Sequence, residues 1–451
     1  MPIRQPPMTT SAASSPHFKK AVSLLGDRQV VVANQAIRNT QGVQVVDSGA
    51  AIHPGLCSVL LQHSLAAPIE DLVSCASSIS GATIRATAEQ ILEDTPFFAR
   101  MAPQARTRNQ LLDALAEVPL PAPIALQLTV AQDVHHEVYL QLVRAALVAT
   151  WLARTPALPR CDPAMAAAAG LLHDIGMLHV DPEILAPDSA LTPERRRELY
   201  LHPLLATTLL ARHGVYPPEV VRAVGEHQEC LDGSGYPRGL AGDAISPLGK
   251  LLSLAQVVAA MFAPGRSSPE MRLSVLLRMT WHRYDNAMAM QVLSLLKPHL
   301  DVMSAELQLL DDPITHLCNI DQLLRQWPMQ PGPASRLTPA RSQALATLAT
   351  YAAQMRRVLA GVGAVPEQLQ LLTQDVQDDA LLGELTLLTR EACWQLGTLA
   401  QQCRRRWQLE PHETFPPVLQ QWLDAVGALV RAVSGMAPGH PNDTDAPGTG
   451  S

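Results

Sequence analysis

Apolar residues recur at helical spacing along most of this chain, and the pattern predicts a mainly α fold. The clearest helical segments lie within residues 129–300, and several open with a capping residue or Pro followed by Pro. We therefore expect an all-α domain over residues 129–300. Its helices are expected at Ala131–Arg154, Leu248–Met261 and Met271–Leu296, with three more that begin at Asp162-Pro163, Thr192-Pro193 and Pro217-Pro218.

A β-like pattern precedes this domain. Val30–Val32 and Val43–Val46 are rich in β-branched residues and flank the turn signal Asn39–Gly42, so they predict a hairpin. Residues 26–128 are expected to form a small α+β module and a helical linker with a Pro-rich break at residues 119–123. The module serves either packing and dimerisation or sensing. Residues 1–25 are rich in Pro, Ser and Thr and predict a disordered tail.

The chain beyond the central domain is again helical in pattern. Residues 301–435 are rich in Leu, Gln and Ala and predict a helical bundle-like region, for example at Leu337–Val362 and Leu381–Trp407. The region has no catalytic constellation, so a regulatory or oligomerising part is expected, and a homodimer is possible. Residues 436–451 predict a second disordered tail.

Composition narrows the classes of partner and compartment. Hydrophobic residues make up 47% of the 451-residue chain and charged residues 17%, so sizeable cores are possible. The formal net charge of −7, without a long basic block, argues against a nucleic-acid polymer as partner but allows a small anionic nucleotide. The 7 Cys are scattered without CxxC spacing, which indicates reduced thiols and a cytoplasmic location. No apolar run is long enough for a membrane span, so no membrane is expected.

Candidate chemistry is concentrated between residues 135 and 260. His173 and Asp174 are adjacent, His202 and His227 follow on later predicted helices, and a Gly-rich loop ends in Gly235-Tyr236-Pro237. Imidazole and carboxylate are ligands expected for iron or manganese. Bound metal ions supply the nucleophile and the charge relief that phosphodiester hydrolysis needs. The pattern therefore indicates a metal centre that works on phosphate.

These motifs resemble the HD-GYP family, a branch of the HD-superfamily metal-dependent phosphohydrolases that hydrolyse cyclic dinucleotides. The resemblance implies a cyclic di-GMP phosphodiesterase-like protein in cyclic dinucleotide signalling. It implies catalytic roles for His173, Asp174 and Lys250, and it implies the metal ligands His135, His173, Asp174, His202 and His227. The loop residues that would border the site and recognise substrate or a partner protein are Asp232, Gly233, Gly235, Tyr236 and Pro237.

The choice of His135 as first ligand follows from helical spacing. Counted from His135, residues Val138, Tyr139, Leu142 and Ala146 fall on one face of the predicted helix. Counted from His136, Arg144 would fall on that face. His136, His179 and His213 are expected to be surface residues.

The chain also departs from the family pattern at four positions. Gln228 replaces the second His of a double His, Gln256 replaces a liganding Asp, Ala259 replaces a second Asp, and Met177 replaces a Lys. A neutral amide is a poorer metal ligand than a carboxylate, so binding of one ion is expected in preference to binding of two. The alternative is a catalytically inactive HD-GYP module that acts as a nucleotide- or protein-binding signalling regulator.

Overall fold

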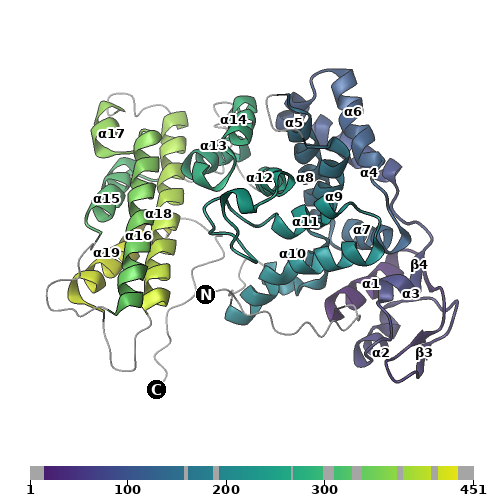
Figure 1. Cartoon of the computed structure of the whole chain (residues 1–451). Helices are drawn as coiled ribbons and strands as arrows, with labels where there is room; N and C mark the ends of the chain where they lie inside the picture. Colours follow the sequence, from purple (N-terminus) through teal and green to yellow (C-terminus); the bar gives the residue numbers. More distant parts are fainter. Residues whose placement is uncertain are drawn as a thin grey trace. The chain divides into compact units, whose positions relative to one another are not determined.

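The fold was examined in a computed structural model, which describes residues 15–156, 161–185, 192–265, 268–297, 309–327, 338–372, 379–407 and 415–434. The chain forms two compact units (Figure 1). The first contains the described residues up to Pro264 together with His282–Leu295. The second contains Gly265–Trp281 and the described residues after Leu296. Helices predominate in both units, so the prediction of a mainly α fold is confirmed.

The N-terminal part of the first unit combines short helices with two small sheets. Its elements are α1 (Pro16–Arg28), β1 (Val31–Ala33), β2 (Ile37–Arg38), β3 (Gln44–Val46), the 3-10 helix η1 (Pro54–Leu56), α2 (Cys57–Gln62), α3 (Ile69–Leu72) and β4 (Val73–Cys75).

Helix α1 corrects the prediction of a tail over residues 1–25. The Ser15 side chain caps the helix by accepting from the Phe18 N–H, as N-cap serines do. Phe18, Val22 and Leu25 are fully buried. Their spacing places them on one face of the helix, a signal that the Pro- and Ser-rich composition obscured. Residues 1–14 and the predicted tail 436–451 lie outside the described residues.

The predicted hairpin exists, but its first strand is different. Asn39–Gly42 turns the chain between β2 and β3, with Asn39 Oδ1 accepting from the N–H groups of Gln41 and Val43. The run at Val30–Val32 instead contributes to β1, which pairs antiparallel with β4. That partner lies far along the chain, so local turn chemistry could not identify it.

The rest of the first unit is a helical assembly (Figure 1). Its elements are α4 (Gly81–Asp94), α5 (Pro96–Met101), α6 (Ala105–Ala116), α7 (Ala122–Val134), α8 (His136–Arg154), α9 (Pro163–Leu172), η2 (Ile175–His179), η3 (Pro182–Leu185), α10 (Pro193–His213), α11 (Pro218–Glu226), η4 (Gly242–Ala244), α12 (Pro247–Met261), η5 (Trp281–Arg283) and α14 (Asn286–Leu295). Helix α8 is central and packs against α4, α6, α7, α9 and α12.

Three predicted boundaries are wrong. The single helix expected at Ala131–Arg154 is two helices, because the chain leaves helical geometry at His135 (φ −124°, ψ 57°). The expected linker is part of the packed assembly: α4 and α6 contact α8, and Tyr216 donates a hydrogen bond to the carbonyl of Pro119. The helix expected at Met271–Leu296 is divided into α13 (Pro269–Met279) and α14, and α13 belongs to the second unit.

The second unit is a set of helices around its own core. Besides α13 it contains α15 (Pro313–Arg325), α16 (Pro339–Gly361), α17 (Pro366–Leu372), α18 (Asp379–Trp407) and α19 (Pro417–Ser434). Met271, Val275 and Met279 of α13 share this core with Leu317 and Leu396. The helical prediction for this region is confirmed, while its regulatory or oligomerising role stays a prediction. Among the described residues, no helix combines the length and apolar character needed to span a membrane.

Candidate metal centre

Four of the predicted ligands lie on helices of the first unit, three of them at a helix end. His173 follows the last residue of α9, and Asp174 precedes η2. His202 lies within α10, and His227 follows the last residue of α11. Gly176 lets η2 approach α10, since a Cβ added there would lie 2.1 Å from the His202 carbonyl oxygen. The Gly of the His-Asp-Ile-Gly segment therefore has a packing role that brings Asp174 close to His202.

Asp174 is the common neighbour of the three imidazoles. Its Oδ2 lies 3.3 Å from Nε2 of His173, and its Oδ1 lies 3.1 Å from Nε2 of His202 and 3.2 Å from Nε2 of His227. The Nε2 atoms of His202 and His227 are 3.1 Å apart. All three rings are buried.

Each ring is held by the backbone through its other nitrogen. Nδ1 of His173 lies 2.8 Å from the carbonyl of Gly170, Nδ1 of His202 lies 2.6 Å from that of Leu199, and Nδ1 of His227 lies 2.6 Å from that of Val224. A carbonyl oxygen only accepts hydrogen bonds, so in the neutral rings Nδ1 carries the hydrogen. Each Nε2 then presents a lone pair toward Asp174. Histidines that bind metals are oriented by this kind of contact.

The arrangement fits a bound cation. His173 Nε2 and Asp174 Oδ1 are buried atoms that form no hydrogen bond within the described part of the chain. Ligand atoms of His173, Asp174 and His227 all lie within 4.8 Å of one another. Lone pairs and a carboxylate in such proximity repel one another, and buried polar atoms without partners are costly. One divalent ion with imidazole and carboxylate ligands would remove both costs.

The pKa shifts reflect the same crowding. Burial alone would lower the pKa of His173, but the Asp174 carboxylate raises it. Burial lowers the pKa of His227 to about 4, which keeps that ring neutral at pH 7. Burial disfavours ionised Asp174, yet the charge of His173 and the close approach of the imidazoles hold its pKa well below the usual range. The carboxylate is therefore available as an anionic ligand.

His135 is not part of this group. It lies between α7 and α8, where burial and the charge of Arg28 lower its pKa, and the described ligand group does not include it. On α8, Gln141 donates from its Nε2 to the backbone carbonyl of Gln256 in α12 at 2.9 Å. The expected face was counted from a residue at which the helix breaks, so the choice of His135 is not supported.

The positions that depart from the family pattern lie around the cluster as follows. Met177 is in η2, and Gln256 and Ala259 are in α12, with Ala259 buried. Gln228 follows His227, and its carbonyl accepts from the N–H of Tyr236. Lys250 forms an ion pair with the exposed Asp243, with a distance of 2.9 Å between Nζ and Oδ1. That pairing does not support its expected role toward phosphate.

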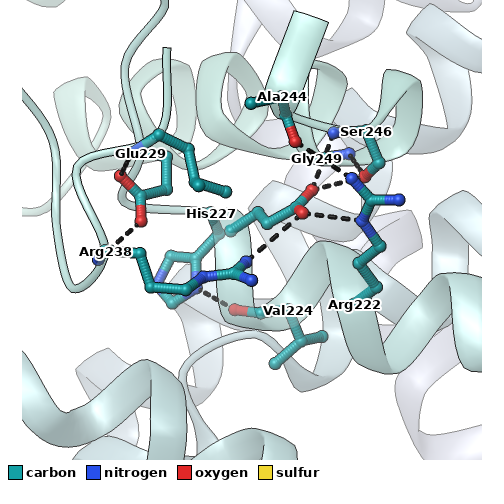
Figure 2. A network of polar contacts seen from close by, with 10 residues as sticks. Arg222, Val224, His227, Glu229, Arg238, Ala244, Ser246 and Gly249 are labelled. Atoms are coloured by element: carbon teal, nitrogen blue, oxygen red, sulfur yellow. Dashed lines mark hydrogen bonds and ion pairs between the residues drawn. The ribbon is translucent and has the colours of Figure 1, made fainter. Parts of the chain in front are cut away.

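Two buried carboxylates, Glu226 before His227 and Glu229 two residues after it, hold the following loop, and the sequence indicates a supporting role beside the ligands only for Glu229. Glu229 accepts hydrogen bonds from the backbone N–H groups of Arg238 and Leu240, each at 2.8 Å (Figure 2). Glu226 accepts from the N–H and hydroxyl of Ser246 and pairs with Arg222 and Arg238. Burial raises the pKa of Glu229, while the loop N–H groups lower it. An acidic residue directly beside a buried ligand is the signal that could have identified them.

Of the loop residues expected from the sequence, Tyr236 lies next to the cluster. Asp232 lies 3.4 Å from Nε2 of His282 and 3.7 Å from Nε of Arg283 in η5. The N–H of Gly233 donates to the carbonyl of Cys230. Gly235 lies against the backbone, since a Cβ added there would be 2.4 Å from Cα of Glu229. Tyr236, joined to Pro237 by a cis peptide bond, has its ring centroid 6.1 Å from that of His202.

Two of the three histidines that were expected at the surface are less exposed than predicted. His179 is buried, stacks on Phe18 with ring centroids 4.6 Å apart, and contacts Gln127 through its Nε2. His213 is half-buried at the end of α10, and His136 is exposed as expected. The packing of α1 against η2 buries His179, and that contact was not foreseen because α1 itself was taken for a tail.

Comparison with known proteins identifies relatives of this region. A family model described as HD domain matches residues 88–288, so the match begins well before the expected boundary at residue 129. The chain is 33% identical over 120 residues to 3'3'-cGAMP-specific phosphodiesterase 3 of Vibrio cholerae serotype O1. This alignment covers 27% of this chain and 26% of that protein. It is 33% identical over 152 residues to the cyclic di-GMP phosphodiesterase PA4108 of Pseudomonas aeruginosa. This alignment covers 33% of this chain and 36% of that protein. The chain thus spans about a quarter to a third of these relatives.

A solved structure is also similar. Bd1817, a HDG"Y"P protein from Bdellovibrio bacteriovorus, aligns with 17% identity and a TM-score of 0.32 over 48% of this chain and 69% of that chain. The HD domain match contains both the His173-Asp174 pair and the Gly-Tyr-Pro loop. Residues 88–288 of the chain therefore match the HD domain family.

Proposed function

We propose that the chain is a cyclic dinucleotide phosphodiesterase of the HD-GYP type that uses one divalent transition metal ion, iron or manganese. The observation that carries the proposal is the convergence of three Nε2 atoms on Asp174, each ring fixed by a backbone carbonyl. The printed names of the relatives support cyclic di-GMP and 3'3'-cGAMP as the substrate class. The proposed ligands are His173, Asp174, His202 and His227.

The residues of the chain have separable roles in this proposal. When bound, such an ion activates a water molecule and relieves charge on the phosphoryl oxygens. Asp174 offsets the charge of the cation, and the buried imidazoles keep a fixed geometry because their Nδ1 atoms are held by the backbone. Glu229 holds the loop that carries Tyr236 beside His202. The proposed cytoplasmic location and a protein partner or homodimer belong to the same proposal.

A second candidate function is a catalytically inactive regulator that binds nucleotide or a partner protein. Gln256 in α12 favours it, because an amide stands where the family resemblance implies a liganding carboxylate. An amide does not offset the charge of a second cation placed close to the first. The two functions share a fold and differ in whether one ion is sufficient for turnover.

The test is metal content together with turnover. Purified protein is analysed for iron and manganese, and hydrolysis of cyclic di-GMP and 3'3'-cGAMP is followed in the same samples. We expect about one ion per chain and measurable turnover of at least one of the two substrates. A metal-containing protein that binds a cyclic dinucleotide without hydrolysing it would establish the regulator instead. A metal-free protein that binds neither nucleotide would refute the phosphodiesterase and the nucleotide-binding regulator.

A further inference from the structure

Tyr200 places an exposed aromatic ring next to the metal centre. It lies on α10, two residues before His202, and is 38% exposed. Its ring stacks on that of Tyr236 with centroids 4.0 Å apart and an interplanar angle of 9°. Tyr236 in turn meets His202 edge-on, at 80°. A continuous path of ring contacts therefore leads from the proposed ligand His202 to the surface.

The two tyrosines differ in what their faces contact. Tyr236 is half-buried, with one face stacked on Tyr200 and its ring edge-on to His202. Tyr200 has one face on Tyr236 and a substantial exposed area. Leu201 and Leu205 on the same helix are also exposed. Tyr200 differs from them because its planar ring stacks on Tyr236 of the loop. A planar face that is supported from behind suits a planar ligand group.

We propose that Tyr200 is a stacking platform for one nucleobase of the cyclic dinucleotide. This inference rests on the proposed function. With a phosphate at the metal centre, the sugar sets a base to one side of it, and base–aromatic stacking is favourable for any base with an open π-face. Tyr236 acts as a positioning residue that keeps the Tyr200 ring in place. The platform binds through ring surface, so it favours a purine over the smaller pyrimidine.

The experiment compares variants and two ligands. The variants are Tyr200→Leu, which removes the aromatic face, Tyr200→Trp, which enlarges it, and Leu205→Ala, which removes an exposed apolar side chain from the same helix. The ligands are slowly hydrolysed phosphorothioate analogues of cyclic di-GMP and cyclic di-UMP, and Kd is measured by calorimetry on metal-loaded protein. Metal content and the thermal unfolding midpoint are recorded for every variant.

We expect Tyr200→Leu to weaken binding of the cyclic di-GMP analogue by roughly 5- to 150-fold, the range for loss of one base–aromatic stack. The loss for the cyclic di-UMP analogue should be smaller. Tyr200→Trp should keep the binding of the purine ligand, and Leu205→Ala should leave both Kd values unchanged. Metal content should be the same in all four proteins. Retention of binding by Tyr200→Trp keeps the test decisive if the Leu variant folds poorly.

Different failures have different signatures. Wild-type protein that binds both analogues, with unchanged Kd in Tyr200→Leu, overturns the inference and leaves the proposed function intact. An equal loss for purine and pyrimidine ligands, or a lower metal content, shows that Tyr200 only supports the loop and also overturns it. Wild-type protein that binds neither analogue overturns the proposed function and this inference together.

Discussion

The two sides of the candidate site preserve the same kind of scaffold and differ in charge. On one side, α9, α10 and α11 present His173, Asp174, His202 and His227 within hydrogen-bonding distances. On the other side, α8 packs against α12, and the Gln141 side chain donates to the backbone carbonyl of Gln256. Helix α12 has a buried apolar face that includes Leu251, Leu254 and Val258. Packing of a helix therefore does not depend on ligand residues, because core contacts and ligand charge impose independent requirements.

The strongest test of the donor side is Asp174→Asn. The change keeps the size of the side chain and removes its charge, so the converging imidazoles lose their anionic partner. We expect metal content to fall to background and turnover to fall below detection, because loss of a ligand empties the site. Asp181→Asn, a few residues along the same segment, is the matched control and should keep both. Full metal content in Asp174→Asn would show that the ion binds elsewhere.

The amide side is tested by restoring charge. Gln256→Asp with Gln228→His adds one carboxylate and one imidazole, which lowers the cost of holding two cations close together. We expect metal content to rise from about one toward about two ions per chain, with faster turnover. The single variants Gln256→Asp and Gln228→His measure the effects of the added carboxylate and of the added imidazole separately.

Gln141 provides a sharper version of that test. One outcome is a double variant that is well folded and yet shows unchanged metal content. In that case the addition of Gln141→His tests whether this third amide, besides Gln228 and Gln256, prevents binding of the second ion. The contact of Gln141 with Gln256 motivates this step. A triple variant that still binds no additional metal would show that the α8–α12 side is no longer a ligand site at all.

The loop that borders the donor side depends on Glu229. Replacing Glu229 with Ala leaves the N–H groups of Arg238 and Leu240 without their acceptor. We expect the free energy of unfolding to fall by about 3–6 kcal/mol, from the loss of two hydrogen bonds to a charged group. Urea denaturation measures the change, and the exposed Glu219→Ala is the control. A loss no larger than in the control would mean that other contacts hold the loop.

His179 tests whether a buried imidazole outside the ligand group behaves differently. Burial lowers its pKa to about 4, with Glu70 raising it and Arg212 lowering it. The folded state thus favours the neutral ring, and the associated stability is complete above the unfolded pKa near 6.5 and is lost as pH falls toward 4. We expect stability to decrease by about 1.4 kcal/mol per pH unit in that window. His179→Phe should flatten the profile measured by urea denaturation, and an unchanged slope would contradict the assignment.

The sequence predicted the donor side well for physical reasons that are local. His173 and Asp174 are adjacent, and the capping signals at Asp162 and Thr192 correctly begin the helices that carry His173 and His202. The choice of His135 rested on a face counted along one helix, and the chain leaves helical geometry at that residue. The loop contacts of Glu229 and the stacking of Tyr200 could not be predicted, because their partners are backbone N–H groups and a ring on a separate loop.

The position of α13 has a consequence for how this protein can be divided or inherited. The chain leaves the first unit after Pro264, contributes Met271, Val275 and Met279 to the core of the second, and returns at His282, which lies beside Asp232 of the loop. A single recombination or truncation point near residue 300 would therefore separate α13 from the core that buries it and expose its apolar face to aggregation. The first unit is therefore discontinuous in sequence. A chimeric protein in which the second unit is exchanged would have to exchange residues 265–281 as well.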